Sequence, residues 1–103
     1  MPTHKKTKIE ILIEASFEKK LSELLDTLDV KGYTVYPVVS GKGEHGNWSR
    51  RGVINVVGQM LLFITIIDSA KAHDIAQKIH DTIEDHLGII TLSEVEVFRD
   101  KKF

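Results

Sequence analysis

The chain has 103 residues, with fourteen Lys and Arg against fifteen Asp and Glu, and it contains no cysteine. This length suits one domain, residues 1–103, and leaves no room for a separate catalytic module. The balanced charge gives no reason to expect nucleic acid as a partner. The lack of cysteine excludes disulfides, thiolate metal sites and thiol nucleophiles, and no signal-peptide pattern is present, so we expect a cytoplasmic protein.

The first half of the chain predicts a strand, a helix and a second strand. Apolar and polar residues alternate over 8–14, as in a half-buried strand. Ser16 is the expected N-cap of a helix that Gly32 ends. Residues 33–39 are rich in β-branched and aromatic residues, and Pro37 indicates an edge position or a bulge.

The second half predicts a strand, a helix and a last strand. Residues 54–67 form a long apolar run, Asp68 or Ser69 can cap the following helix, and 89–98 supply the last strand. The apolar stripe of this helix comprises Ala72, Ile75, Ala76, Ile79, Ile83 and Leu87. The order βαββαβ predicts a ferredoxin-like α+β fold, with a four-stranded antiparallel sheet and two helices on one face.

The strand over 54–67 is apolar on both of its faces, although two helices can cover only one face of the sheet. Leaving the second face in water would cost about 1.5–3 kcal/mol for each large apolar side chain. We therefore expect a homo-oligomer that packs through the helix-free side of the sheet. The alternative is a bend or bulge at Gly58, so that the two halves of the strand face opposite sides of the sheet.

Residues 40–53 form the one long irregular stretch, and loops of this length are usually functional. Gly41, Gly43 and Gly46 have the spacing G-x-G-x-x-G, but a strand follows where a dinucleotide site needs a helix. Glycines still let backbone N–H groups approach an anion closely, and Lys42 stands among them. A hairpin loop made of turn-forming residues is the alternative interpretation.

Two further groups of side chains suit contact with a partner or with an anion. Trp and Arg are common interface anchors, so a docking loop is predicted to use His45, Trp48, Arg50 and Arg51, unless Trp48 packs on its own protein. Basic residues cluster near both chain ends and in the loop, and such clusters can converge in space.

No constellation of side chains predicts catalysis or a metal site. His73, His80 and His86 are seven and six residues apart, which does not fit the i, i+4 pairing of helical metal ligands. Glu94 and Glu96 share one face of the last strand, where ion pairs with Lys or Arg are expected. No nucleophile has an attendant base, so catalytic and metal residues are both predicted to be absent.

The βαββαβ order, "GYTV" at 32–35, "SGKG" at 40–43 and "GIITLSEVEVF" at 88–98 together resemble the PII signalling family. The resemblance is closer to its PII-like branch, which includes carboxysome-associated and bicarbonate-transporter-associated proteins. It implies a homotrimer, adenine nucleotides in clefts between subunits, and a long T-loop, here about 40–53, that signals to a partner protein.

When the family's binding residues are transferred to this sequence by position, the resemblance implies a nucleotide site made of Thr34, Gly41, Lys42, Gly43, Gly88, Ile89 and Arg99. Thr34 matches the threonine beside the adenine, and the glycines of "SGKG" match those whose backbone meets the phosphates. Gly88 and Ile89 match the B-loop, which lies on the neighbouring subunit's side of the cleft. Arg99 stands near the family's C-terminal basic groups.

The sequence also departs from the PII pattern. Glu44 and His45 stand where PII proteins have arginine and glutamine, and Ile90 lies near the position of the B-loop lysine. Because each phosphate needs its own charge-assisted hydrogen bonds, fewer cations favour AMP, ADP or cyclic AMP over ATP. No cofactor or 2-oxoglutarate sensing is expected, whereas bicarbonate and a membrane transporter or carboxysome-related protein are the implied co-ligand and partners.

Two other functions stay open at this point. One is a ferredoxin-like protein-interaction scaffold that binds no nucleotide. The other is a small enzyme acting on a dicarboxylate or aromatic acid, for which His45 would be the residue to test, because a fold alone does not determine function.

Overall fold

The computed structural model describes residues 2–43, 46–49, 59–84 and 88–99. Its elements are β1 (His4–Glu14), a 3₁₀ helix (Ala15–Phe17), α1 (Glu18–Thr27), β2 (Thr34–Pro37), β3 (Ser40–Gly43), β4 (Gly46–Ser49), β5 (Met60–Ile67), α2 (Ser69–Ile83) and β6 (Gly88–Val97).

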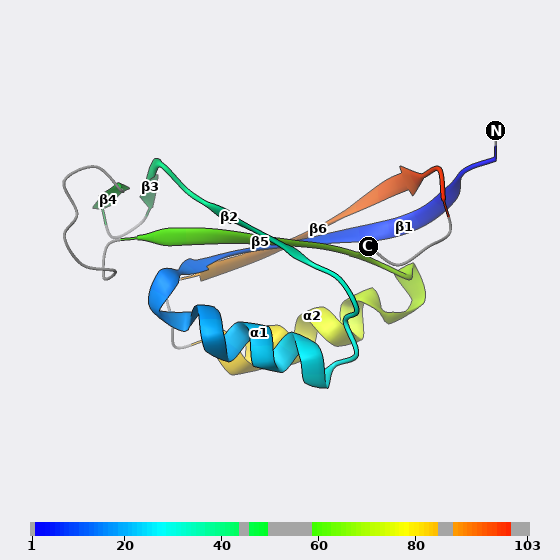
Figure 1. Ribbon diagram of the computed structural model, residues 1–103, viewed down its shortest axis with the longest axis horizontal. Helices are drawn as coiled ribbons and strands as arrows, with labels where there is room; N and C mark the ends of the chain where they lie inside the picture. Colours follow the sequence, from blue (N-terminus) through cyan, green and yellow to red (C-terminus); the bar gives the residue numbers. More distant parts are fainter. Residues whose placement is uncertain (1, 44–45, 50–58, 85–87, 100–103) are drawn as a thin grey trace.

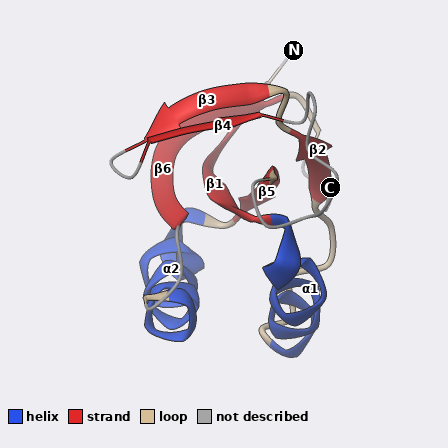
Figure 2. Cartoon of the chain, turned by 90° about the vertical axis from the view of Figure 1, so that its left-hand side faces the viewer, coloured by secondary structure: helices blue, strands red, loops and turns tan. Residues whose placement is uncertain are grey.

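Four of the strands form one antiparallel sheet in the order β2-β5-β1-β6. Both helices lie against the same face of this sheet (Figures 1 and 2). The ferredoxin-like α+β fold predicted from the sequence is therefore confirmed. Because β2 forms one edge of the sheet, the edge position that Pro37 indicated is confirmed as well.

The core lies between the sheet and the two helices. Side chains of a strand alternate between its two faces, and the odd-numbered residues of β1 face the helices. In the β1–β5 register Ile11 stands opposite Phe63, and the Phe63 ring stacks on Tyr33 at 5.8 Å between centroids. The buried apolar residues are Ile9, Ile11, Ile13, Phe17, Leu21, Leu25, Val30, Met60, Leu61, Phe63, Ala72, Ile75, Ala76, Ile79 and Ile83.

The first helix begins and ends at residues other than those predicted. Ser16 does not cap it, because residues 15–17 form a 3₁₀ helix that is tied to the start of β5 by the hydrogen bond from Ala15 N to Gln59 O, 2.9 Å. Its end is set by Asp29, whose φ of 60° lies in the left-handed region that aspartate tolerates, so Gly32 is not the stop.

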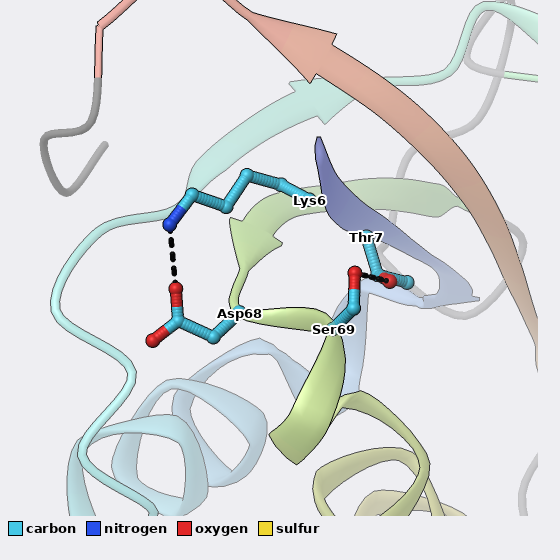
Figure 3. Close-up of polar contacts among 4 residues, drawn as sticks. All are labelled: Lys6, Thr7, Asp68 and Ser69. Carbon is cyan, nitrogen blue, oxygen red and sulfur yellow. Dashed lines mark hydrogen bonds and ion pairs between the residues drawn. The ribbon is translucent and has the colours of Figure 1, made fainter. Parts of the chain in front are cut away.

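The second helix follows the sequence prediction closely. Asp68 is its N-cap residue, but the carboxylate makes no hydrogen bond to the first turn and accepts one from Lys6 Nζ at 2.6 Å (Figure 3). Beside it, Thr7 Oγ1 donates to Ser69 Oγ at 2.8 Å, so both contacts join α2 to β1. The predicted stripe is buried, apart from Leu87, which lies outside the described residues.

The stretch predicted as an irregular loop contains regular structure. β3 and β4 pair into a separate two-stranded antiparallel sheet, with Gly41 opposite Trp48. Pairing satisfies backbone groups that a loop would leave to water. This hairpin lies on the helix-free side of the main sheet (Figures 1 and 2). Residues 44–45 and 50–58, including Gly58 with its predicted alternative bulge, lie outside the described residues.

The described part of β5 is apolar on both faces, as predicted. Leu61 and Phe63 are buried under the helices, whereas Leu62, Ile64 and Ile66 face the helix-free side and are only half-buried. On flanking strands of the same side, Tyr36 and Ile89 have more than half of their surface exposed. The helix-free face thus carries apolar side chains that the described residues of one chain do not cover.

Two phenylalanines provide a matched test of the core. Phe63 is 1% exposed and Phe98 is 65% exposed. We expect Phe63→Ala to lower the free energy of unfolding by about 3–5 kcal/mol, because it removes buried surface and leaves a cavity. Phe98→Ala should change it by less than about 0.5 kcal/mol in chemical denaturation. Equal losses for the two variants would contradict the placement of Phe63 in the core.

Candidate functional site

The first part of the predicted nucleotide site lies on one edge of the main sheet and in the hairpin that follows it. Thr34 opens β2 and stands opposite Ile64 of β5. Shortly after the end of β2, Gly41, Lys42 and Gly43 form most of β3. Lys42 is exposed and Thr34 is half-buried, so both are accessible on this edge.

Gly88 and Ile89 lie on the opposite edge of the same sheet. They begin β6, where Gly88 pairs with Ile13 and Ile89 pairs with Leu12 of β1. β5 and β1 therefore separate them from β2, and Ile89 points outward with 57% of its surface exposed. A single chain does not bring Gly88 and Ile89 next to Thr34.

Arg99 lies at the other end of β6 from Gly88, in a cavity of about 640 Å³. The cavity is bounded by the end of β5, the start of α2 and the turn after α1. Its charged lining residues are Lys6, Asp29, Lys31, Asp68, Lys71 and Arg99, and its apolar lining includes Leu28, Val30, Ile66, Ile67, Ile75, Val97 and Phe98.

The charges around this cavity are predominantly positive. Lys6 pairs with Asp68 at 2.6 Å, and Lys31 pairs with Asp29 at 2.5 Å. The hydrogen bond to Asp29 and its negative charge raise the pKa of Lys31 above its ordinary value. Lys71 and Arg99 have no carboxylate at ion-pair distance within the described ranges, so the cavity keeps an excess of positive charge suited to an acidic ligand.

The sequence analysis missed Lys31 and Lys71 as members of this group. It did note that the basic clusters at the two chain ends could converge, and Lys6 and Arg99 do line the same cavity. Of the basic residues of the loop, Lys42 does not line it, and Arg50 and Arg51 lie outside the described residues. The sheet register places the start of β1 beside the ends of β5 and β6, but Lys31 and Lys71 join the group only because the turn after α1 and the start of α2 lie at the same cavity.

The residues predicted to dock a partner are only partly described. Trp48 belongs to β4, paired with β3 opposite Gly41. His45, Arg50 and Arg51 lie outside the described residues. The docking loop therefore remains a prediction.

The other titratable groups have the following placements. His73 and His80 are exposed on α2, and His86 lies outside the described residues. Glu96 accepts a hydrogen bond from Thr3 Oγ1 at 2.7 Å, and neither Glu94 nor Glu96 has an ion pair within the described ranges, so the predicted pairing with Lys or Arg is wrong there. These ranges also hold no group of three or more metal-binding side chains.

The chain belongs to the nitrogen regulatory protein P-II family, whose sequence model matches residues 6–102. Members of this family are regulatory proteins. A comparison with curated protein sequences found no match. Among the described residues, no helix is long and apolar enough to cross a membrane.

Solved structures of PII-like proteins are similar to this chain. CPII, a nitrogen regulatory PII-like protein from Thiomonas intermedia K12 bound to ADP, AMP and bicarbonate, is 26% identical, with a TM-score of 0.85 over 95% of this chain and 92% of CPII. A PII-like signalling protein from Thermus thermophilus is also 26% identical, with a TM-score of 0.78 over 94% and 93% of the two chains. The GlnK–ATP complex of B. subtilis, at 20% identity and a TM-score of 0.56 over 88% and 82%, shares the fold.

Gly88 has a structural role that any binding experiment must separate from ligand contact. A Cβ added there would lie 2.9 Å from the backbone oxygen of Leu12, closer than real Cβ atoms come. We expect Gly88→Ala to lower the unfolding temperature by several degrees, because β6 must shift away from β1. Glu94→Ala, at an exposed position of the same strand opposite Thr7 and not on the helix-free face, is the control in thermal unfolding. An unchanged unfolding temperature for Gly88→Ala would contradict this close approach.

Proposed function

We propose that this chain is a non-enzymatic PII-like sensor that binds ADP or AMP in clefts between the subunits of a homotrimer. Family membership supports a regulatory role, and CPII, a structural relative, was solved with ADP, AMP and bicarbonate. The observation that carries the proposal is the division of the predicted site between β2 and β6, on opposite edges of one sheet.

A cyclic assembly of several chains would bring the two parts of the predicted site together. Adjacent subunits in a cyclic assembly meet through different surfaces, so the β2 edge of one copy can meet the β6 edge of the next. Thr34 and the glycines of β3 would then face Gly88 and Ile89 of the neighbour. Both edges are uncovered within the described part of a single chain.

The residues at the start of the hairpin suit a short phosphate chain. Backbone N–H groups of Gly41 and Gly43 can approach phosphate oxygens without interference from a Cβ, and Lys42 supplies one cation. One cation at this position favours a monophosphate or diphosphate over a triphosphate. Cyclic AMP is a further candidate ligand for the same reason.

The adenine base would lie beside Thr34, at the first residue of β2. Gly32, two residues earlier, lines the cavity, and Ile66 supplies an apolar wall there. An aromatic base gains from such a surface, while the Thr34 hydroxyl can hydrogen-bond a ring nitrogen or amino group. Arg99, which lines the same cavity, would then contact this ligand or the ligand in the neighbouring cleft.

Ligand binding would be signalled through the T-loop, 40–53. Ordering of a segment by new phosphate contacts is a known switching mode. His45, Trp48, Arg50 and Arg51 would then form or withdraw the docking surface for a target. By resemblance, the target is a membrane transporter or a carboxysome-related protein, with bicarbonate as co-ligand, and the setting is inorganic-carbon uptake in the cytoplasm.

Calorimetry with AMP, ADP, cyclic AMP and ATP tests this proposal. We expect ADP or AMP to bind, and Thr34→Val to weaken binding about tenfold, because the shape is kept and one hydrogen bond is lost. Thr82→Val is the matched control, since that hydroxyl lies on α2 and donates to Lys78 O. Absence of heat with all four nucleotides at millimolar concentration would reject the proposal.

A further inference from the structure

Two opposite charges lie in the middle of the helix-free face of the sheet. Lys8 and Glu10 are on β1, an inner strand, and both point away from the helices, because Ile9 between them is buried against the helices. On one side they are opposite Ile66 and Ile64 of β5. On the other side they are opposite Ser93 and Thr91 of β6.

Within one chain these two charges are only loosely paired. Lys8 Nζ lies 3.8 Å from Glu10 Oε1, which is an ion pair but too long for a hydrogen bond. Each side chain is 32% exposed, so water still solvates both groups. Lys6, next in the same row, is held by Asp68 at 2.6 Å and is 17% exposed.

Any subunit that covers the apolar side chains of this face must also cover Lys8 and Glu10. Leu62, Ile64 and Ile66 lie on one side of β1 and Ile89 lies on the other, so the charges are between the apolar groups to be buried. Removing the water from a charge costs several kcal/mol unless a hydrogen-bonded partner replaces it. A 3.8 Å contact within the chain does not supply such a partner.

We propose that Lys8 of each subunit forms its hydrogen-bonded ion pair with Glu10 of the next subunit, in a closed ring on the helix-free face. Each copy offers one cation and one anion, so a cyclic assembly leaves neither charge unpaired. This ring of ion pairs would determine which face of the sheet the subunits pack through and in which register they are aligned. This inference rests on the proposed homotrimer and adds the contact that specifies it.

Charge reversal tests the ring through the trimer dissociation constant in sedimentation experiments. Lys8→Glu or Glu10→Lys places like charges together, so each should raise the dissociation constant at least about tenfold. Lys78→Glu is the matched control, because Lys78 pairs with Asp74 at 3.2 Å on the outer face of α2. Glu10→Gln, a milder change, should raise the constant less and weaken its dependence on salt.

Mixing the two reversed variants distinguishes pairing between subunits from pairing within one chain. The double variant K8E/E10K restores both kinds of pair and should assemble like the original protein. An equimolar mixture of K8E and E10K chains can restore only contacts between chains, and in a ring of three it restores two of the three contacts while the third joins like charges. We expect this mixture to assemble at least about tenfold more tightly than either variant alone.

Three results would overturn the proposal. If both single variants assemble as tightly as the original protein, the ring does not exist, although the trimer stands. If the double variant is restored and the mixture is not, the pair lies within one chain. If the original protein has no trimer to dissociate, the proposed assembly fails together with the ring.

Discussion

The strict alternation of side chains along a β-strand is the constraint on which this structure depends. In β5 it places Leu61 and Phe63 under the helices and turns Leu62, Ile64 and Ile66 to the opposite side. The two helices cover only one face, so the described residues of one chain leave the second row only half-buried. In the proposed homotrimer, further copies of the chain would bury the whole row at once.

The proposed homotrimer would also explain why the predicted site residues are dispersed. Thr34 and the glycines of β3 lie on one edge, whereas Gly88 and Ile89 lie on the other, with two strands between them. A single chain could not bind one small ligand with both sets of residues, because two strands separate them. In the proposed homotrimer, apolar burial and ligand binding would use the same contact between subunits, and the charges of Lys8 and Glu10 would determine its register.

The sequence predicted those parts of the fold that local periodicity determines. The alternation of Ile9, Ile11 and Ile13 and the stripe from Ala72 to Ile83 were both confirmed. Ser16 and Gly32 failed as helix boundaries because a 3₁₀ turn and the left-handed Asp29 replaced them. The β3–β4 pairing was missed because its glycines carry no alternating pattern, and the cavity lysines were missed because β1, α2 and the turn after α1 converge only in space.

The molecular mass of the purified protein in dilute solution tests the central claim most directly. Light scattering should give three times the 11.6 kDa of one chain, because the proposed homotrimer buries the helix-free face of each subunit. A stable, folded species of 11.6 kDa would contradict the account, since one chain would then tolerate the uncovered face and no cleft between subunits would exist.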